Sequence, residues 1–320
     1  MKKILLISIL AFIGTELYGQ AFYSNRINRK WLASGGLGYA RGLGDLTNPG
    51  SYFDTKLNVI GGIHYRFSNR VHAGINYMAF QLSGNDLDID PELNTRSRGL
   101  SFVSDNMELT ATASISLFPT ATRFTQRRLI NPFVFAGVGV LFYAPKAEVP
   151  EFVRNQAGDP VDSLGTVPRA GEMVYLRQYQ TERPNTYGRF AVVIPVGAGV
   201  RVKVNDFMDI TAQVSNRITF TDYLDDVSGV NGRGYPSLDQ FDLNNPEDIT
   251  ALALSDPTGR GEIRGNPEDN DYYLIFNVKA EFYIQGEFLN KVFGVGGKKF
   301  NIKPNRGRGG MFNFLKRRRY

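Results

Sequence analysis

The segment Tyr272–Ile284 reads YYLIFNVKAEFYI, and taking every second residue sorts it into an apolar set and a mixed set. The apolar set has Phe276 and Val278 at its centre, whereas the other set contains Lys279 and Glu281. Successive side chains of a β-strand point to opposite faces, so this period of two predicts a strand. A strand that is apolar along one whole face and charged on the other is typical of a membrane β-barrel, because lipid contacts the outside and polar groups face the lumen.

The same alternation recurs along the chain and predicts eight strands in all. They span residues 31–43, 57–67, 71–82, 108–118, 133–143, 190–204, 207–221 and 272–284. Pairing of the fourth strand is expected to start as early as Leu100.

The connections between these strands alternate in length. Residues 68–70, 119–131 and 205–206 form short or moderate connections, whereas 44–54, 83–99, 144–189 and 222–271 form long ones. Outer-membrane barrels have short periplasmic turns and longer external loops. We therefore predict an all-β fold: an eight-stranded antiparallel up-and-down transmembrane β-barrel with periplasmic termini and long extracellular loops.

Aromatic residues near the expected strand ends agree with this topology, because aromatic girdles mark the two membrane interfaces. Those near the short-turn rim are Tyr65, Phe67, Phe118, Phe133, Phe207 and Phe282, and those near the other rim are Phe142, Phe190, Phe220 and Tyr272. The alternative is a soluble eight-stranded barrel of lipocalin type, which turns its apolar residues inward. The charged residues on the other face would then lie outside in water, and the membrane barrel is the favoured interpretation because it seals them together inside.

The predicted inward faces carry ionisable residues of both signs, which we interpret as a structural ion network in the lumen. Its members are Arg66, Glu108, Arg201, Lys203, Asp209, Arg217, Lys279 and Glu281. An eight-stranded barrel is just wide enough inside for its side chains, so we expect a plugged lumen. A narrow or gated channel is the alternative. Asn216 is a misfit, because this register places it on the lipid face.

The start of the chain has the features of a signal peptide. Lys2 and Lys3 precede an apolar stretch at 4–13, and Leu17-Tyr18-Gly19 is a candidate cleavage site. The apolar stretch is too short to span a bilayer as a helix; the alternative is a buried helix of a cytosolic protein. We predict a signal peptide at 1–20, an outer-membrane barrel at 21–286 and a basic periplasmic tail at 287–320. The expected location is the outer membrane.

The sequence offers little for catalysis or metal binding, and no enzymatic activity or cofactor is expected. Cysteine is absent, and the histidines are His64 and His72, on adjacent strands near the short-turn rim. Neither has the carboxylate partner on the outer rim that a barrel protease or acyltransferase would need. Asp86, Asp88 and Asp90 begin like a calcium loop, but Pro91 and Ser97 stand where glycine and glutamate are required.

The last long loop and the tail carry opposite charge. Residues 222–270 hold eleven acidic residues against Arg233, Arg260 and Arg264, and this composition predicts a mobile or partly ordered loop. Residues 286–320 have a net charge of +9, which leaves −3 for the rest of the chain.

The basic tail is a candidate docking segment for an acidic protein partner, or else a disordered segment that contacts anionic lipid headgroups. The residues expected to bind are Lys298, Lys299, Lys303, Arg306, Arg308, Lys316, Arg317, Arg318 and Arg319. Phe312 and Phe314 interleave with these charges as in nucleic-acid tails, but export argues against nucleic acid as a partner. Gly297-Lys298 lacks the flanking residues of a phosphate-binding loop.

Three segments carry a resemblance to a known family. They are Ser83-Gly84-Asn85-Asp86, Arg98-Gly99-Leu100-Ser101-Phe102 and Thr221-Asp222-Tyr223-Leu224-Asp225-Asp226-Val227-Ser228. With them, residues 31–286 resemble the small outer-membrane barrels of Bacteroidetes, most closely the PorG-like component of the type IX secretion system. The resemblance implies a barrel that ties the outer membrane to a periplasmic ring of the secretion machine.

The sequence thus predicts a non-enzymatic barrel that acts as a structural anchor of a type IX-like secretion machine. Its expected partners are outer-membrane lipid and periplasmic or outer-membrane proteins of a secretion complex. The alternative is a small porin-like or surface-binding barrel with no role in secretion, whose function would depend on the external loops and tolerate loss of the tail.

Overall fold

The protein forms a closed barrel in a computed structural model, which describes residues 30–44, 46, 55–86, 98–119, 127–228, 235–259, 264–266, 268 and 270–284. The predicted signal peptide at 1–20 and basic tail at 287–320 lie outside the described residues, as do Asp88, Asp90, Pro91 and Ser97 of the acidic loop.

Eight antiparallel strands close the barrel. They are β1 (Trp31–Leu43), β2 (Lys56–Arg66), β3 (Val71–Asn85), β4 (Ser101–Ser116), β5 (Ile130–Phe142), β8 (Phe190–Lys203), β9 (Met208–Thr219) and β10 (Tyr272–Ile284). Each pairs with its neighbour along the chain, β10 pairs with β1, and the β3–β4 pairing completes the ring. The predicted eight-stranded fold is confirmed, and β4 starts at Ser101, close to the early start allowed for it.

The direction of the side chains is also as predicted, because apolar side chains alternate outward. Val192, Phe276 and Val278 are 49%, 47% and 43% exposed, whereas Asn277 and Lys279 on the same strand as Phe276 are 0% and 4% exposed. A lipocalin-type barrel has the opposite arrangement and is excluded. An apolar exterior around a polar interior is the arrangement of an outer-membrane barrel.

The predicted assignment of Phe133 to an aromatic girdle is wrong. Phe133 is 5% exposed and points inward, where its ring lies under the guanidinium of Arg201 at 4.7 Å. Phe67 and Phe190, near opposite rims, are strongly exposed as expected. Asn216 faces outward between Val196 and Leu274 of the neighbouring strands.

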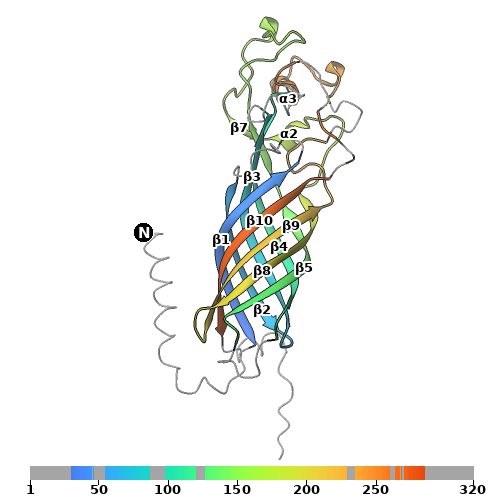
Figure 1. Cartoon of the computed structure of the whole chain (residues 1–320). Coiled ribbons are helices and arrows are strands. Elements are labelled where there is room, and N and C mark those ends of the chain that lie inside the picture. Colours follow the sequence, from blue (N-terminus) through green and yellow to red (C-terminus); the bar gives the residue numbers. More distant parts are fainter. Residues whose placement is uncertain are drawn as a thin grey trace, which may run out of the picture. The chain divides into compact units, whose positions relative to one another are not determined.

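Short and long connections lie at opposite ends of the barrel (Figure 1). The turns after β2, β4 and β8 lie at one end, which we call the short-turn rim, and the connections after β1, β3, β5 and β9 lie at the other. Trp31 pairs with Ile284, so β1 begins and β10 ends at the short-turn rim.

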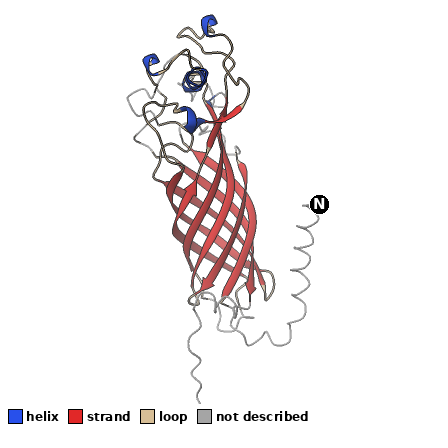
Figure 2. Cartoon of the chain, turned by 180° about the vertical axis from the view of Figure 1, so that it is seen from behind, coloured by secondary structure: helices blue, strands red, loops and turns tan. Residues whose placement is uncertain are grey.

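The long connections contain secondary structure of their own, which the sequence did not predict (Figure 2). Strands β6 (Pro145–Glu148) and β7 (Met173–Tyr175) extend the sheet beyond the upper part of β4, and helices α2 (Leu176–Tyr179) and α3 (Pro246–Ser255) lie beside them. We call the described parts of these connections the cap. None of the helices among the described residues is long and apolar enough to cross a bilayer.

The cap has an apolar core that continues into the barrel. Inward side chains at the loop end of the strands belong to it: Met78, Leu141, Val193 and Ile275 are at most 1% exposed. They form one cluster with the cap residues Leu46, Leu100, Val149, Val174, Leu176, Leu224, Val227 and Leu254. The loop half of the lumen therefore holds apolar and polar side chains together, since the buried Glu108 lies in register between Met78 and Leu141.

The described part of the loop at 222–270, which the sequence predicted to be mobile or partly ordered, is folded around a helix. Helix α3 begins after Asn245, whose side chain accepts a hydrogen bond from the Glu247 amide, and Pro246 follows at the first helical position. Residues 250–255 of the helix are buried. The acidic composition did not indicate this fold, because several of the carboxylates accept hydrogen bonds from groups inside the cap.

Candidate functional site: a polar lumen and a buried cluster in the cap

The upper layer of the polar lumen is built around Glu108. Its carboxylate accepts hydrogen bonds from Arg217 Nε at 3.1 and 3.2 Å and from the hydroxyl of Tyr273 at 2.6 Å. Glu108, Arg217 and Tyr273 come from β4, β9 and β10, and all are at most 2% exposed. The layer links non-neighbouring strands across the barrel interior.

A second layer joins β8 to β10. Arg201 Nε donates to Glu281 Oε2 at 2.7 Å, while Lys279 Nζ lies 3.9 Å from Glu281 Oε1. Arg201 also donates to Ser116 Oγ at 3.4 Å. The alternation of β10 puts Lys279 and Glu281 on the same face, so a single carboxylate serves two cations.

A third layer closes the short-turn end. Asp209 accepts from Arg127 Nη1 and from the Tyr283 hydroxyl, each at 2.8 Å, and the guanidinium of Arg127 lies 4.1 Å over the Tyr283 ring. Arg66 is also buried at this end. Lys203, expected in the network, lies instead at the rim, where its Nζ is 2.9 Å from the half-exposed Asp206.

The two histidines point into the lumen but form no catalytic arrangement. His64 Nε2 lies 3.1 Å from Ser34 Oγ, and His72 Nε2 has no hydrogen-bond partner among the described residues. Both line the polar cavity that also contacts Glu281.

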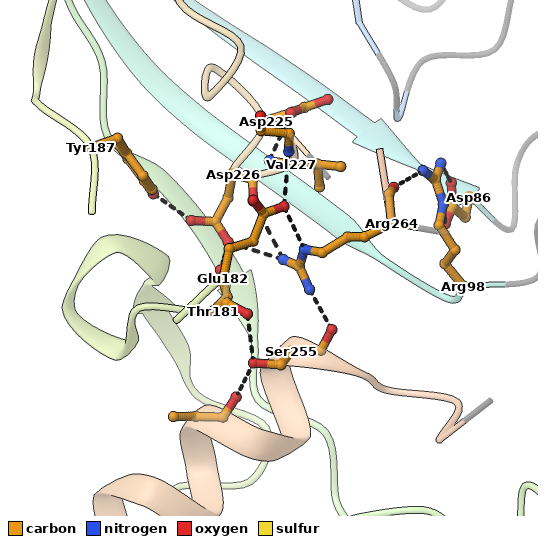
Figure 3. Close-up of polar contacts among 12 residues, drawn as sticks. Asp86, Arg98, Thr181, Glu182, Tyr187, Asp225, Asp226, Val227, Ser255 and Arg264 are labelled. Carbon is orange, nitrogen blue, oxygen red and sulfur yellow. Dashed lines mark hydrogen bonds and ion pairs between the residues drawn. The ribbon is translucent and has the colours of Figure 1, made fainter. Parts of the chain in front are cut away.

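The three segments that carry the family resemblance meet in one buried cluster of the cap (Figure 3). Asp86 and Arg98 form a two-point ion pair with bonds of 2.7 and 2.9 Å. Arg98 also donates to the carbonyl of Arg264, whose own guanidinium reaches Glu182 at 3.1 Å and Asp226 at 3.3 Å. These side chains are nearly inaccessible, so the cluster ties the connections after β3, β5 and β9 together.

Asp226 is the centre of this cluster. Its backbone is left-handed, with φ of 69°, a conformation that aspartate tolerates better than most residues. Its carboxylate accepts hydrogen bonds from the hydroxyls of Thr181 and Tyr187 and faces Arg264. Burial raises the pKa of Asp226 to about 6, and the ion pair with Arg264 and these two hydrogen bonds oppose the rise.

Two further carboxylates fix the chain around Asp226. Asp225 accepts from the amides of Leu46 at 3.2 Å and Val227 at 3.0 Å, and Asp271 accepts from the amide of Leu224 at 2.9 Å. The acidic segment 221–228 is thus a structural joint between the first and last long connections.

Several residues of these sites were missed from the sequence. Arg127 stands in a connection without periodicity, so no signal placed it in the lumen. Tyr273 and Tyr283 lie on the inward face of β10, where their position in the alternation marks them as lumenal. Glu182 and Arg264 lie in long loops and only the fold brings them together.

The arrangement supports cross-linking rather than chemistry. Among the described residues, no three histidines, cysteines or carboxylates are grouped to hold a metal ion. Paired guanidinium and carboxylate groups occupy the lumen from the short-turn rim to the level of Glu108, where apolar side chains of the loop end adjoin them. The nine tail residues expected to bind a partner, from Lys298 to Arg319, lie outside the described residues.

No protein-family model matches the sequence, and no curated protein matches it either. Among solved structures, the chain is similar to Neisserial surface protein A, with 9% identity and a TM-score of 0.38 over 79% of this chain and 97% of that one. It is similar to Ail, the attachment invasion locus protein of Yersinia pestis, with 9% identity and a TM-score of 0.36 over 80% and 99%. It is also similar to the N-terminal barrel domain of Pseudomonas aeruginosa OprF, with 9% identity and a TM-score of 0.33 over 79% and 98%.

Proposed function

We propose that this barrel is a structural anchor of a protein-secretion machine of the type IX kind and that its basic tail docks an acidic periplasmic partner. The observation that carries the proposal is the concentration of charge: residues 286–320 carry +9, and the rest of the chain carries −3. A segment with this charge attracts an acidic protein surface over several ångströms of water.

Two features of the barrel support an anchoring role. Side chains occupy its interior at both ends, so its activity is exerted at its ends rather than through its lumen. The segments that resemble PorG-like barrels converge on one buried cluster, which is what a shared structural signature requires. Strand β10 ends at the short-turn rim, the same end at which β1 begins.

The test is affinity purification from detergent-solubilised outer membranes with three matched chains. One is full length, one ends at Ile284, and one has the nine tail residues from Lys298 to Arg319 changed to glutamine. An acidic periplasmic protein that co-purifies with the first chain and not with the other two supports docking. Equal recovery of the same proteins by all three chains overturns it.

Contact with anionic lipid is distinguished by flotation of the purified tail peptide with vesicles. Vesicles of phosphatidylglycerol and of phosphatidylcholine are compared, because lysine and arginine near a membrane gain about 1 kcal/mol each only from the anionic surface. Flotation with the first kind, together with no protein partner in the purification, assigns the tail to the lipid.

A second candidate function is surface binding by the cap, and the observation that favours it is that the cap is folded. Its ion cluster and apolar core hold a fixed surface in front of the barrel mouth, with Met173, Tyr175, Leu238 and Leu243 exposed. A chain lacking the tail that retains adhesion to cells or matrix, and loses it when Tyr175 and Leu238 are changed to serine, favours this function over the anchor.

A further inference from the structure

The lumen contains a cavity of about 30 Å³. Its wall carries the ionisable groups Arg201, Arg217, Lys279, Glu281, His64 and His72, the hydroxyl and amide side chains of Asn76, Thr110, Thr112, Ser114 and Gln213, and the apolar side chains of Ile60, Phe133 and Phe135. Since a water needs roughly 15 Å³ of such space, the cavity holds one or two bodies of that size. It is polar, so it does not stay empty.

The charges on the cavity wall do not balance. Arg217 is neutralised by Glu108 at 3.1 Å, which leaves Arg201 and Lys279 with the single carboxylate of Glu281. Glu281 is committed to Arg201 at 2.7 Å, and Lys279 Nζ stands back at 3.9 Å. The cavity wall and Glu108 together carry one more positive charge than negative, and the buried Lys279 has its paired carboxylate oxygen only at 3.9 Å.

The lysine side chain is held in place by the fold. Gly36 of β1 pairs with Lys279, and a Cβ at Gly36 would lie 2.9 Å from Lys279 Cγ and 2.2 Å from the Val278 carbonyl oxygen. The glycine thus lets the aliphatic stem of Lys279 lie against β1. A buried ammonium group in such a position needs a counter-ion or must lose its proton, because burial of an unpaired charge is costly.

Other unpartnered polar atoms face the same space. His72 Nε2 has no hydrogen-bond partner among the described residues, and neither has Asn76 Oδ1, although Asn76 Nδ2 donates to Thr112 Oγ1 at 3.0 Å. His72 can donate from Nε2, and the hydroxyls of Thr110 and Ser114 can turn to donate as well. Asn76 Oδ1 is an acceptor, so the donors available to an anion are the Lys279 ammonium group, His72 Nε2 and these hydroxyls, and such a set of donors is the chemistry of an anion site.

We propose that the lumen holds one halide ion, chloride under physiological conditions, bound to Lys279 and to the surrounding donors. The cavity is too small for phosphate or a carboxylate metabolite, and a cation would face two arginines and a lysine. The ion completes the charge balance of the layer that joins β8 to β10. It is therefore a structural ion of the barrel, independent of what the tail binds.

The first test is diffraction from crystals grown in bromide, at the bromine absorption edge. An anomalous peak is expected in the cavity, within hydrogen-bond or ion-pair distance of Lys279 Nζ. Peaks only on the exterior, with the cavity empty or filled by water, overturn the proposal.

The second test is thermal unfolding of the full chain in detergent, in sodium chloride and in sodium gluconate at equal ionic strength. Chloride at ten times its Kd is expected to raise the midpoint by about 3–6 °C. Lys279→Met is expected to abolish this shift. Lys203→Met is the matched control, because Lys203 already pairs with Asp206 at the rim, and it is expected to keep the shift.

The outcomes separate cleanly. Equal midpoints of the unaltered chain in the two salts, or a shift that survives in Lys279→Met, contradict the lumenal site. If Lys279→Met does not fold, the bromide map of the unaltered chain decides alone.

Discussion

The barrel and the cap bury opposite kinds of side chain. In the membrane-spanning part, Glu108 and Asp209 are inside and Leu37 and Val192 are outside, whereas in the cap Val227 and Leu252 are inside. The kind of side chain that is exposed changes because the surroundings change. Lipid favours apolar side chains on the barrel exterior, and water favours polar side chains on the cap surface. One chain follows both rules, and the two kinds of buried side chain meet inside the barrel, where Glu108 lies in register between Met78 and Leu141.

Both regions nevertheless use buried arginine–carboxylate pairs. In the lumen these pairs cross-link strands, and in the cap Arg98 and Arg264 cross-link loops. The difference is the neighbourhood, because the lumenal pairs stand in a polar layer and the cap pairs stand beside an apolar core. Variants in the two regions therefore measure how far that difference sets stability.

Glu281→Gln removes a buried carboxylate from the lumenal ion network. It leaves Arg201 and Lys279 without their shared carboxylate, and removal of one partner of a buried ion pair costs about 3–5 kcal/mol. Urea unfolding in lipid vesicles measures the loss. Glu172→Gln in the cap is the matched control, because its pair with Arg169 is exposed and contributes about 0–1 kcal/mol. Equal losses in the two variants would contradict a lumenal ion network that stabilises the barrel.

Leu141→Ala tests the continuity of the cap core with the barrel mouth. Leu141 is 0% exposed, and truncation of such a side chain costs about 2–5 kcal/mol. Leu109→Ala, on the same barrel but 56% exposed on the outer face, is expected to cost well under half of that. Proteolysis of the cap should quicken in Leu141→Ala alone, and an unchanged rate would show that the two cores are separate.

The stability of the cap should fall as the pH rises through the pKa of Asp226. That pKa is about 6, above the ordinary value of 3.8, so the folded state favours the protonated carboxyl. The contribution is complete below pH 3.8, declines through pH 6 and is constant above. Hydrogen exchange of cap amides at pH 4.5 and 7.5 measures it, relative to Asp226→Asn, which cannot titrate. Protection that rises with pH relative to Asp226→Asn would reverse the assigned sign.

Asn245→Ala has the smallest expected effect and is confined to the cap. The side chain of Asn245 caps α3 by accepting from the Glu247 amide at 3.1 Å, and loss of such a cap costs about 1 kcal/mol. Ser237→Ala is the control, because Ser237 precedes the short helix at 238–240 without a capping bond from its side chain. Exchange protection of α3 should fall in the first variant only.

The barrel could be predicted from the sequence because each strand carries its own signal. The alternation in Tyr272–Ile284 assigns Lys279 and Glu281 to the lumen without knowledge of any neighbour, and the structure places both there. Phe133 was misassigned because its strand is apolar on both faces, so that periodicity does not say which side is inward.

The cap could not be predicted because its order comes from contacts between distant segments. Asp86 and Arg264 belong to different loops, and neither loop has a period or a propensity that predicts its structure. The acidic residues at 222–270 indicate a solvated loop when counted, whereas Asp225 and Asp226 accept hydrogen bonds from the Leu46 amide and the Thr181 hydroxyl of other connections.

The bond from the Leu46 amide to Asp225 joins residues that are 179 positions apart in the chain. Such a bond forms only after β10 has found β1, since these strands bring the first and last connections together. The folded cap therefore depends on closure of the barrel, and an antibody specific for the folded cap would distinguish closed barrels from open sheets.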